Sequence, residues 1–443
     1  MKLFSLTLLL SVLFGWNCYG QRSRHVVLIT IDGFRPEFYL EPSWGMVNLR
    51  QMKENGVCAT SVDGVFPTVT FVNHTSIITG EKSAKHGILY NAPFKPKGER
   101  SEWYWFYDAI KVPTLWDAAK NNDLTTAAVN WPVSVGGPID HNIPIIKMKG
   151  KDRLEVIKKY STPAGLFEEV QQNATGTLEP EDFMVRENYL AMDANVGRIS
   201  AYIIRKYKPS LMTIRLSVVD HFQHKYGRNG KMVKAAVAGA DRAIRDIIEA
   251  LDRAGIRENT TVLVTGDHGF VNTHTAIAPN IWLKEEGLLD EKGDWKAQFH
   301  TVGGSAFLML KDPDDTGSLQ QVRDILQKRP PGEKKLYQFI ERKELDSLGV
   351  DSRPSFGLKA LPGVVFKNSI EGEVIRPHRL GTHGYYPDTP GIKTGFVGFG
   401  AGMRNGLRVD RMGLEDIAPL VAELLGMEWR SEGGVLLKGM LNK

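Results

Sequence analysis

Beyond residue 20 the chain opens with a continuous run of apolar and β-branched residues at positions 25–31. A run without polar alternation is typical of a strand that is buried on both faces, as in a central parallel sheet. Residues 126–129, 211–216 and 261–265 repeat this pattern. The sequence therefore predicts a buried sheet that contains at least these four strands.

Helical patterns separate the predicted strands. The clearest covers about residues 231–254, where apolar side chains recur on one face and Gly255 supplies a stop signal. Strands that alternate with helices predict an α/β fold with a doubly wound, mostly parallel central sheet and helices on both faces. Two segments break the alternation. We expect residues 92–108 to form a loop near the site, and residues 275–377 to form an inserted irregular segment packed on the sheet.

The first twenty residues have the composition of a secretory signal peptide. Lys2 precedes an apolar stretch at residues 3–14, which is too short to span a bilayer, and small or polar residues precede Gln21. We therefore expect a signal peptide at residues 1–20, a single catalytic domain at 21–443, and a secreted or periplasmic protein. No later stretch is long and apolar enough to predict a transmembrane span in the mature chain.

Cysteine content and charge narrow the class of protein. After removal of Cys18 only Cys58 remains, so no intramolecular disulfide is possible. A secreted animal protein of this size usually carries several disulfides, which favours a bacterial-type protein. The formal net charge is +5 and there is no long basic block, which argues against binding to a nucleic-acid duplex. A small anionic substrate fits this charge better.

Several acidic and histidine residues stand where predicted strands end. Six of them offer oxygen and nitrogen ligands suited to zinc: Asp32, Asp220, His224, Asp267, His268 and His383. Ligands collect at the carboxyl ends of strands in α/β proteins, and Asp-x-x-x-His places both side chains on one helix face. Six ligands suffice for two zinc ions with an open position on each. Any one motif is common by chance, and iron or manganese would accept the same ligands.

Thr70 is the candidate nucleophile. It lies in the segment Phe-Pro-Thr-Val-Thr-Phe, just before a helix predicted over residues 73–79 that ends at Gly80. A helix amino terminus favours a phosphate and a developing alkoxide, and a bound zinc ion would promote loss of the hydroxyl proton. Thr70 as a simple N-cap and Thr68 as the nucleophile are the alternatives that the sequence leaves open.

The combined motifs resemble those of the nucleotide pyrophosphatase/phosphodiesterase family of the alkaline phosphatase superfamily. The order is Asp-Gly at 32–33, Pro-Thr-x-Thr-Phe-x-Asn-His at 67–74, Thr-Gly at 79–80, His-Gly-Ile at 86–88, Asn at 91, Asp-x-x-x-His at 220–224, Asp-His-Gly at 267–269 and His-Gly-Tyr at 383–385. The resemblance covers nearly the whole mature chain.

The resemblance implies a role for each matching residue. One zinc would be held by Asp220, His224 and His383, and the other by Asp32, Asp267 and His268. Thr70 would also contact the second metal and form a covalent phospho-threonine intermediate. The resemblance further implies that Asn91 steadies a phosphate oxygen and that Phe71 lies against the substrate.

Three positions depart from the family pattern. Val72 replaces a proline, Gln223 replaces a glycine, and Arg215 stands where nucleotide-cleaving members carry a tyrosine that stacks on the base. Arg215 could bind a second anionic group of the substrate or form a salt bridge with a neighbour. The loop at 95–107 could replace the missing stacking surface. Tyr385, next to His383, could line the pocket or simply pack under the insertion.

The sequence therefore predicts a dizinc hydrolase of phosphodiester or pyrophosphate bonds, with a nucleotide or related small phosphodiester as substrate. The alternatives within the superfamily are a phospholipid head-group phosphodiesterase, a phosphomonoesterase and a phosphonate hydrolase. A sulfatase is disfavoured because no Cys-x-Pro-x-Arg segment is present. A metal-stabilised binding protein that lacks catalysis is the alternative from another class, but binding alone would not need Thr70.

Overall fold

The structure is a computed structural model that describes residues 23–96, 101–183, 189–290, 292 and 294–442. The expected signal peptide at residues 1–20 lies outside the described residues. Within the described part of the chain, no helix is long and apolar enough to cross a membrane.

A nine-stranded sheet forms the centre of the fold, in the order β17-β2-β16-β6-β1-β5-β3-β4, with β18 also paired to β2. Only the two pairs that involve β16 are antiparallel. All four predicted strands belong to this sheet, and β1 is buried from its second residue onward because neighbouring strands and helices cover it. The strands are β1 (His25–Ile31), β2 (Gly56–Asp63), β3 (Thr126–Val129), β4 (His141–Ile143), β5 (Leu211–Leu216), β6 (Thr260–Thr265), β16 (Thr394–Gly400), β17 (Leu407–Val409) and β18 (Met412–Gly413).

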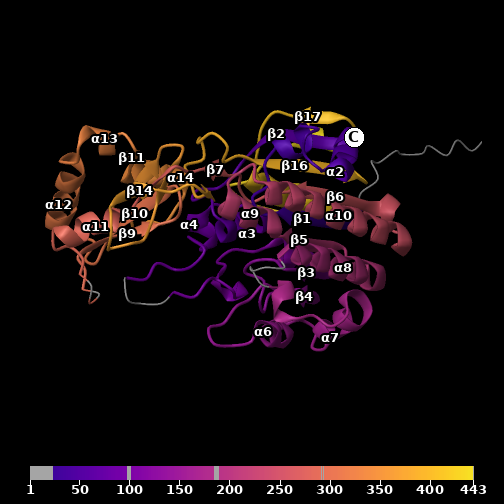
Figure 1. Ribbon diagram of the computed structural model, residues 1–443. Helices are drawn as coiled ribbons and strands as arrows, with labels where there is room; N and C mark the ends of the chain where they lie inside the picture. Colours follow the sequence, from indigo (N-terminus) through magenta and orange to yellow (C-terminus); the bar gives the residue numbers. More distant parts are fainter. Residues whose placement is uncertain (1–22, 97–100, 184–188, 291, 293, 443) are drawn as a thin grey trace, which may run out of the picture.

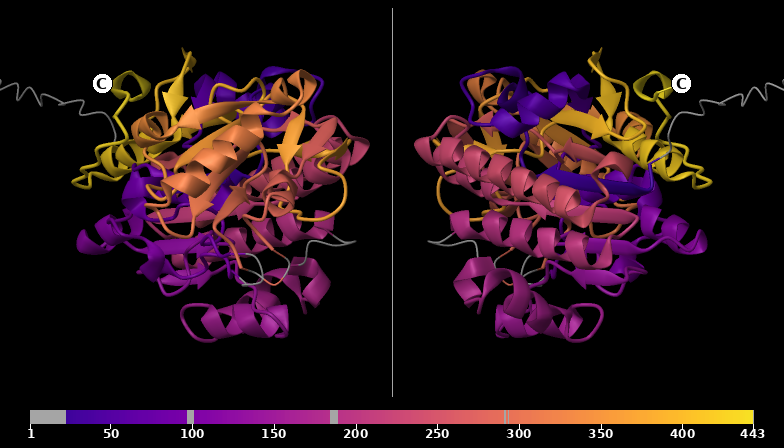
Figure 2. Two further views of the ribbon diagram at one scale, coloured as in Figure 1. Left: turned by 90° about the vertical axis from the view of Figure 1, so that its left-hand side faces the viewer. Right: turned by 90° about the vertical axis from the view of Figure 1, so that its right-hand side faces the viewer.

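Helices cover both faces of the central sheet, so the predicted fold class is confirmed. The longest, α10, has the predicted bounds and packs along α8, and Figure 2 shows these two helices side by side. One face carries α2 (Val47–Glu54), α8 (Tyr189–Tyr207) and α10 (Lys231–Ala254). The opposite face carries α3 (Thr70–Thr79), α5 (Leu115–Asn121) and α15 (Ile417–Leu425). Shorter helices include α6 (Arg153–Tyr160) and α7 (Leu166–Val170).

The segment at 275–377 is more regular than the irregular insertion that we expected. It forms a second lobe, orange in Figure 1, around an antiparallel sheet in the order β11-β12-β10-β9. Its strands escaped prediction because they are short and separated by glycine, proline and charged residues. The elements are β9 (Ala297–Thr301), β10 (Ser305–Leu310), β11 (Tyr337–Glu341), β12 (Phe356–Ala360), α11 (Pro279–Glu285), α12 (Thr316–Gln327), α13 (Pro331–Lys334) and α14 (Arg342–Leu348).

Two small sheets connect the second lobe to the central sheet. One has the order β13-β8-β14 and the other pairs β15 with β7. In Figure 1, β7 lies between the lobe and the central sheet. Their strands are β7 (Val271–Asn272), β8 (Thr275–Ile277), β13 (Val364–Phe366), β14 (Ile375–Pro377) and β15 (Gly381–Thr382).

Candidate active site

The fold brings the six proposed ligands to one edge of the central sheet. Asp32 follows β1, and Asp267 and His268 follow β6, which is the parallel neighbour of β1. β5, the other parallel neighbour, leads into α9 (Val218–Tyr226), which carries Asp220 and His224. His383 directly follows β15. Because the carboxyl ends of adjacent parallel strands meet, these residues come together although they are far apart in the sequence.

The turn after Asp32 depends on a glycine. Gly33 has a φ of +72°, and a Cβ atom there would lie 2.7 Å from Nε2 of Gln223. The Gln223 side chain donates to the carbonyl oxygen of Gly33 at 2.8 Å, while the Gly33 amide donates to Oδ1 of Asp267 at 3.1 Å. Gln223, one of the departures from the family pattern, therefore helps to fix this turn.

Each of the three carboxylates has an oxygen that is free of hydrogen-bond donors. Oδ1 of Asp32, Oδ1 of Asp220 and Oδ2 of Asp267 are buried and accept no hydrogen bond from any residue in the described ranges. The second oxygen of Asp32 accepts from Arg215, with Nε at 2.9 Å. The second oxygen of Asp267 accepts from the amides of Gly33 and His268. Buried carboxylate oxygens without donors are unfavourable unless a cation is bound.

The three proposed histidine ligands share one orientation. In each, Nδ1 faces a backbone carbonyl: Gly381 O for His224 at 3.1 Å, Gly269 O for His268 at 3.1 Å, and Thr68 O for His383 at 3.0 Å. A proton on Nδ1 that is donated to a carbonyl leaves the lone pair on Nε2, which is the arrangement found in metal-ligating histidines. Nε2 of His224 lies 3.4 Å, and Nε2 of His383 lies 3.8 Å, from Oδ1 of Asp220.

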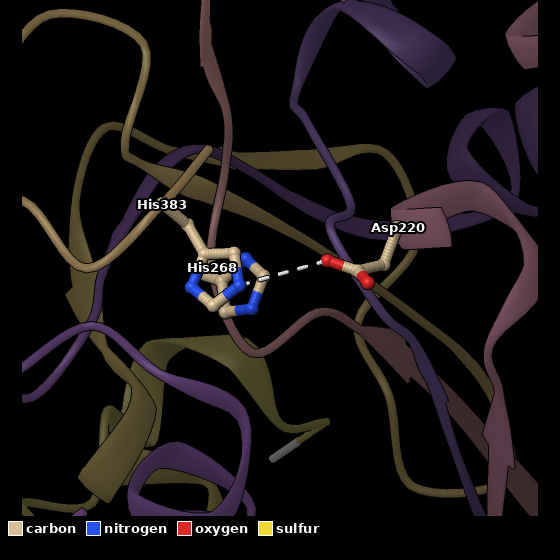
Figure 3. A group of neighbouring side chains, drawn as sticks. All are labelled: Asp220, His268 and His383. Carbon is tan, nitrogen blue, oxygen red and sulfur yellow. Dashed lines mark ion pairs between the residues drawn. The ribbon is translucent and has the colours of Figure 1, made fainter. Parts of the chain in front are cut away.

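Two groups of side chains could hold metal ions. Asp32, Asp267 and His268 form one group, and the second contains Asp220, His268 and His383, with all ligand atoms of a group within 4.8 Å of one another. The first group is the triad that we predicted. In the second, His268 replaces the expected His224, because the rings of His268 and His383 stack at 3.6 Å (Figure 3). His224 remains adjacent through its contact with Asp220.

Burial sets the ionisation of the cluster. Burial and the nearby charge of Asp32 raise the pKa of Asp220 and Asp267 well above their usual range. Burial alone would also raise the pKa of Asp32, but the adjacent Arg215 guanidinium, together with His268 and His74, outweighs it and holds this pKa low. Burial lowers the pKa of His224 and His268 to about 4, so both imidazoles are neutral at pH 7. Neutral imidazoles and crowded carboxylates are the chemistry of a cation site.

Thr70 lies at the start of α3, beside this cluster. It is the first residue of the helix, Val69 occupies the N-cap position, and no side-chain cap hydrogen bond is present there. The Thr70 hydroxyl lies 3.5 Å from Nε2 of His268. Thr68, by contrast, donates its hydroxyl hydrogen bond to Tyr385 O at 2.8 Å. Of the two threonines, Thr70 therefore has the hydroxyl next to the proposed ligands.

Asn91 is oriented by the same helix start. Its Oδ1 accepts a hydrogen bond from the Phe71 amide at 2.9 Å, which leaves the side-chain NH2 group to donate elsewhere. A cavity of about 280 Å³ opens beside Asn91 and the histidines. It is lined by Val69, Tyr90, Asn91, Ala92, His224, His300, Thr301, Val302, Gly303, Thr382 and His383. Four of these residues come from the second lobe, so the lobe forms one wall of the cavity.

Three residues predicted to bind substrate do not line this cavity. Phe71 is fully buried, with its ring against the edges of Trp103 and Trp105. Tyr385 is also fully buried, and its hydroxyl donates to Val364 O at 2.5 Å. Arg215 is buried against Asp32, which matches the salt-bridge alternative. Neighbouring side chains cover all three, so the prediction of direct substrate contact does not fit their positions.

Two residues of this site were not predicted from the sequence. His74 lies one turn after Thr70 on α3, and its Nδ1 contacts Thr70 O at 2.8 Å and lies 3.6 Å from Oδ2 of Asp267. Its spacing of four from Thr70 could have revealed it. His300 from the second lobe lies with its ring 4.3 Å from that of Tyr90 at the cavity wall. No sequence signal marks His300, because the strands of the inserted segment were not predicted.

Paired metal-ligand groups beside a helix-terminal threonine, at the carboxyl edge of a parallel α/β sheet, define the phosphoester hydrolases of the alkaline phosphatase type. The model of the type I phosphodiesterase/nucleotide pyrophosphatase family matches residues 26–386, and the chain belongs to this family. The resemblance seen in the motifs is thereby confirmed, and so is the expectation of an enzyme that hydrolyses phosphoric diesters. The bacterial-type assignment stays a prediction.

Curated relatives and solved structures agree with this family. The chain is 22% identical to bovine (Bos taurus) bis(5'-adenosyl)-triphosphatase ENPP4 over 98% of its length and 85% of the relative. It is 20% identical to mouse (Mus musculus) ectonucleotide pyrophosphatase/phosphodiesterase family member 7 over 92% of the chain and 84% of the relative. The fold is similar to that of murine ectonucleotide pyrophosphatase/phosphodiesterase 5, solved as an inactive threonine-to-alanine variant in complex with AMP, with a TM-score of 0.69, 18% identity and coverage of 95% and 100%.

Proposed function

We propose that the protein is a dizinc hydrolase that cleaves phosphodiester or pyrophosphate bonds through a covalent phospho-threonine intermediate on Thr70. The observation that carries the proposal is the shared orientation of the site. His224, His268 and His383 turn Nε2 toward carboxylates that each keep one oxygen without a donor from the described residues, and the Thr70 hydroxyl lies beside His268. The substrate is a nucleotide or a related small phosphodiester.

The chain's own residues supply positioning and the nucleophile. When bound, zinc would provide the positive charge that favours the alkoxide form of a hydroxyl and stabilises a phosphoryl group in displacement. Thr70 Oγ1 attacks phosphorus as the bond to the leaving-group oxygen breaks, and water then cleaves the Thr70–phosphate bond. The side-chain NH2 group of Asn91 donates to a phosphate oxygen, because its carbonyl oxygen is held by the Phe71 amide.

The aromatic loop supports a planar group on the substrate. Trp103 is 45% exposed, stacks on the buried Trp105 with ring centroids 5.7 Å apart, and meets the Phe71 ring in a T-shaped contact. An exposed indole held by buried aromatics is a suitable surface for a nucleobase or an aryl leaving group. Trp103 would provide the stacking surface that a tyrosine provides in nucleotide-cleaving members, where this chain has Arg215. The AMP bound to murine family member 5 and the triphosphatase name of the bovine relative are consistent with a nucleotide substrate.

We expect zinc-loaded enzyme to hydrolyse bis-p-nitrophenyl phosphate and p-nitrophenyl thymidine 5'-monophosphate at least about tenfold faster than p-nitrophenyl phosphate, in kcat/KM. Each diester carries a second ester group that the cavity and Trp103 can hold, whereas the monoester carries only the p-nitrophenyl leaving group. Release of p-nitrophenol at equal zinc occupancy measures all three. Preference for the monoester would assign the phosphomonoesterase alternative, and no turnover of any of them would contradict the proposed chemistry.

Replacement of Arg215 by Met should weaken zinc binding by about 10- to 100-fold, the usual cost of losing a partner that orients a metal ligand. Arg215 directs two of its donor nitrogens, Nε and Nη2, to one oxygen of Asp32 and leaves the other oxygen for the metal. Competition with a chromophoric chelator measures the affinity. Arg215→Lys, which keeps the charge but loses the paired donors, is the control. Unchanged or tighter zinc binding in Arg215→Met would show that Arg215 does not position Asp32.

Export and domain organisation complete the proposal. We infer a signal peptide at residues 1–20, a single catalytic domain at 21–443, and a secreted or periplasmic location from the composition of the amino terminus. A small phosphodiester is the partner, and the modest net charge gives no support to binding of a nucleic-acid duplex. Amino-terminal sequencing of exported protein would locate the cleavage site.

A further inference from the structure

A group of basic side chains lies on one face of the small sheet β13-β8-β14. In this sheet Val365 and Arg376 both pair with Ala276, so the three side chains share a face. Strand alternation places Lys367, two residues after Val365, on the same face. The opposite face, which carries Ile277, Phe366 and Ile375, packs into the core of the second lobe. Lys367 and Arg376 are therefore directed together away from that core.

This basic group has no acidic partner among the residues that the structure describes. Neither Lys367, Arg376 nor Arg379 forms an ion pair with any residue in the described part of the chain. Lys367 is half-buried, and burial together with the neighbouring charge of Arg376 lowers its pKa. Two cations that are partly removed from water and close to each other are unfavourable unless an anion neutralises them. The arrangement therefore has the properties of an anion-binding site.

Hydrogen bonds join the basic group to the active-site cavity. The Phe366 amide, one residue before Lys367, donates to the carbonyl oxygen of Gly303 at 2.8 Å, and Gly303 lines the cavity. His378 Nδ1 lies 2.7 Å from the Thr273 hydroxyl, and this hydroxyl also contacts Leu380 O, one residue before the carbonyl that holds His224. The group therefore lies at the His224 side of the cavity.

We propose that Lys367, Arg376 and His378 form an anion subsite that receives a second phosphate group of the substrate, next in the chain to the phosphate attacked by Thr70. This inference rests on the proposed function and narrows its substrate class. The preferred substrate is an ester with two or more linked phosphates, rather than a diester with a single phosphate. Lysine and arginine donors would form charge-assisted hydrogen bonds with the second phosphate, and its charge would neutralise them.

The test compares two nucleotides that differ by one phosphate and that the enzyme cannot cleave between a first and a second phosphate. AMP and α,β-methylene-ADP are titrated calorimetrically into zinc-loaded enzyme. We expect α,β-methylene-ADP to bind at least about tenfold more tightly than AMP, which corresponds to about 1.4 kcal/mol. In the double variant Lys367→Met/Arg376→Met the two nucleotides should bind equally, with AMP affinity within about twofold of the wild type. The base and first phosphate are common to both ligands, so the ratio isolates the second phosphate.

Lys328→Met is the matched control, since it removes one positive charge from α12's exposed carboxyl-terminal end in the same lobe. It should leave the ratio unchanged. A ratio that persists in the double variant, or an equal loss of affinity for both nucleotides, would overturn the subsite. Hydrolysis of bis-p-nitrophenyl phosphate, which has no second phosphate, should be retained by the double variant. If the wild-type enzyme did not hydrolyse bis-p-nitrophenyl phosphate, the proposed function itself would be refuted.

Discussion

Thr70→Ala should lower kcat by about a thousandfold or more, because removal of a covalent nucleophile eliminates the main route of reaction. The variant should keep its fold and its zinc. The hydroxyl lies beside His268, and no cap hydrogen bond depends on it. Turnover of bis-p-nitrophenyl phosphate, zinc content and melting temperature would be measured on the same preparation. Thr70→Ser retains a hydroxyl at nearly the same point and should retain measurable turnover.

Thr68→Ala is the matched control for the other threonine in this segment. Thr68 donates to Tyr385 O, so its removal should cost about 1 kcal/mol of stability while most of the activity remains. A phosphorylated peptide trapped by rapid acid quench should contain Thr70 and should disappear in Thr70→Ala. Full activity in Thr70→Ala, or a trapped phosphate on Thr68, would move the nucleophile and contradict the proposal.

The central sheet was predictable because its strands are buried on both faces. Residues 25–31 form a continuous apolar and β-branched run, which is how the interior of a parallel sheet appears in a sequence, and residues 211–216 are likewise buried throughout. Asp32 and Asp267 could be placed together for the same reason, since strand ends can be read from the pattern even when the order of the strands cannot. The grouping of Asp32, Asp267 and His268 as one triad came from the resemblance to the family, and the structure brings these three residues together.

Side-chain contacts between separate segments were not predictable in this way. Arg215 was interpreted from its position five residues before Asp220. Its pairing with Asp32 depends on the register of β1 and β5, in which Thr30 lies opposite Arg215. Tyr385 is adjacent to the site in sequence, yet it turns toward Val364 in the second lobe. The sequence shows which chemical groups lie near one another along the chain, but strand register and packing decide which side chains face the cavity.

The second lobe shows a further limit. Its strands alternate imperfectly, as in β11, where buried and exposed positions are mixed because only one face meets the core. Short antiparallel strands of this kind give a weak pattern between charged and glycine-containing turns. As a result, His300 and Gly303 of this lobe, which line the cavity, were not predicted as site residues. The basic group beside His224 also became visible only through the pairing of β8 with β13 and β14.

Removal of zinc by a chelator should abolish turnover and also lower the melting temperature. Without cations the cluster holds three carboxylate oxygens that no described residue satisfies, and burial together with the charge of Asp32 disfavours ionisation of Asp220 and Asp267. A site held at a hundredfold excess of zinc over its Kd contributes about 2.7 kcal/mol to the free energy of unfolding. Zinc should restore both activity and melting temperature, whereas calcium, which prefers oxygen ligands, should restore neither.

Asp267→Asn separates the metal effect from general destabilisation. The amide oxygen can still accept the hydrogen bonds of the Gly33 and His268 amides, so the turn after β1 and the end of β6 keep their support. The group that faces the metal loses its charge, however. The variant should bind about one zinc fewer per chain, and chelation should change its melting temperature less than that of the wild type. If chelated wild-type enzyme, free of metal by elemental analysis, kept its activity, the carboxylates and histidines would not form the proposed dizinc site.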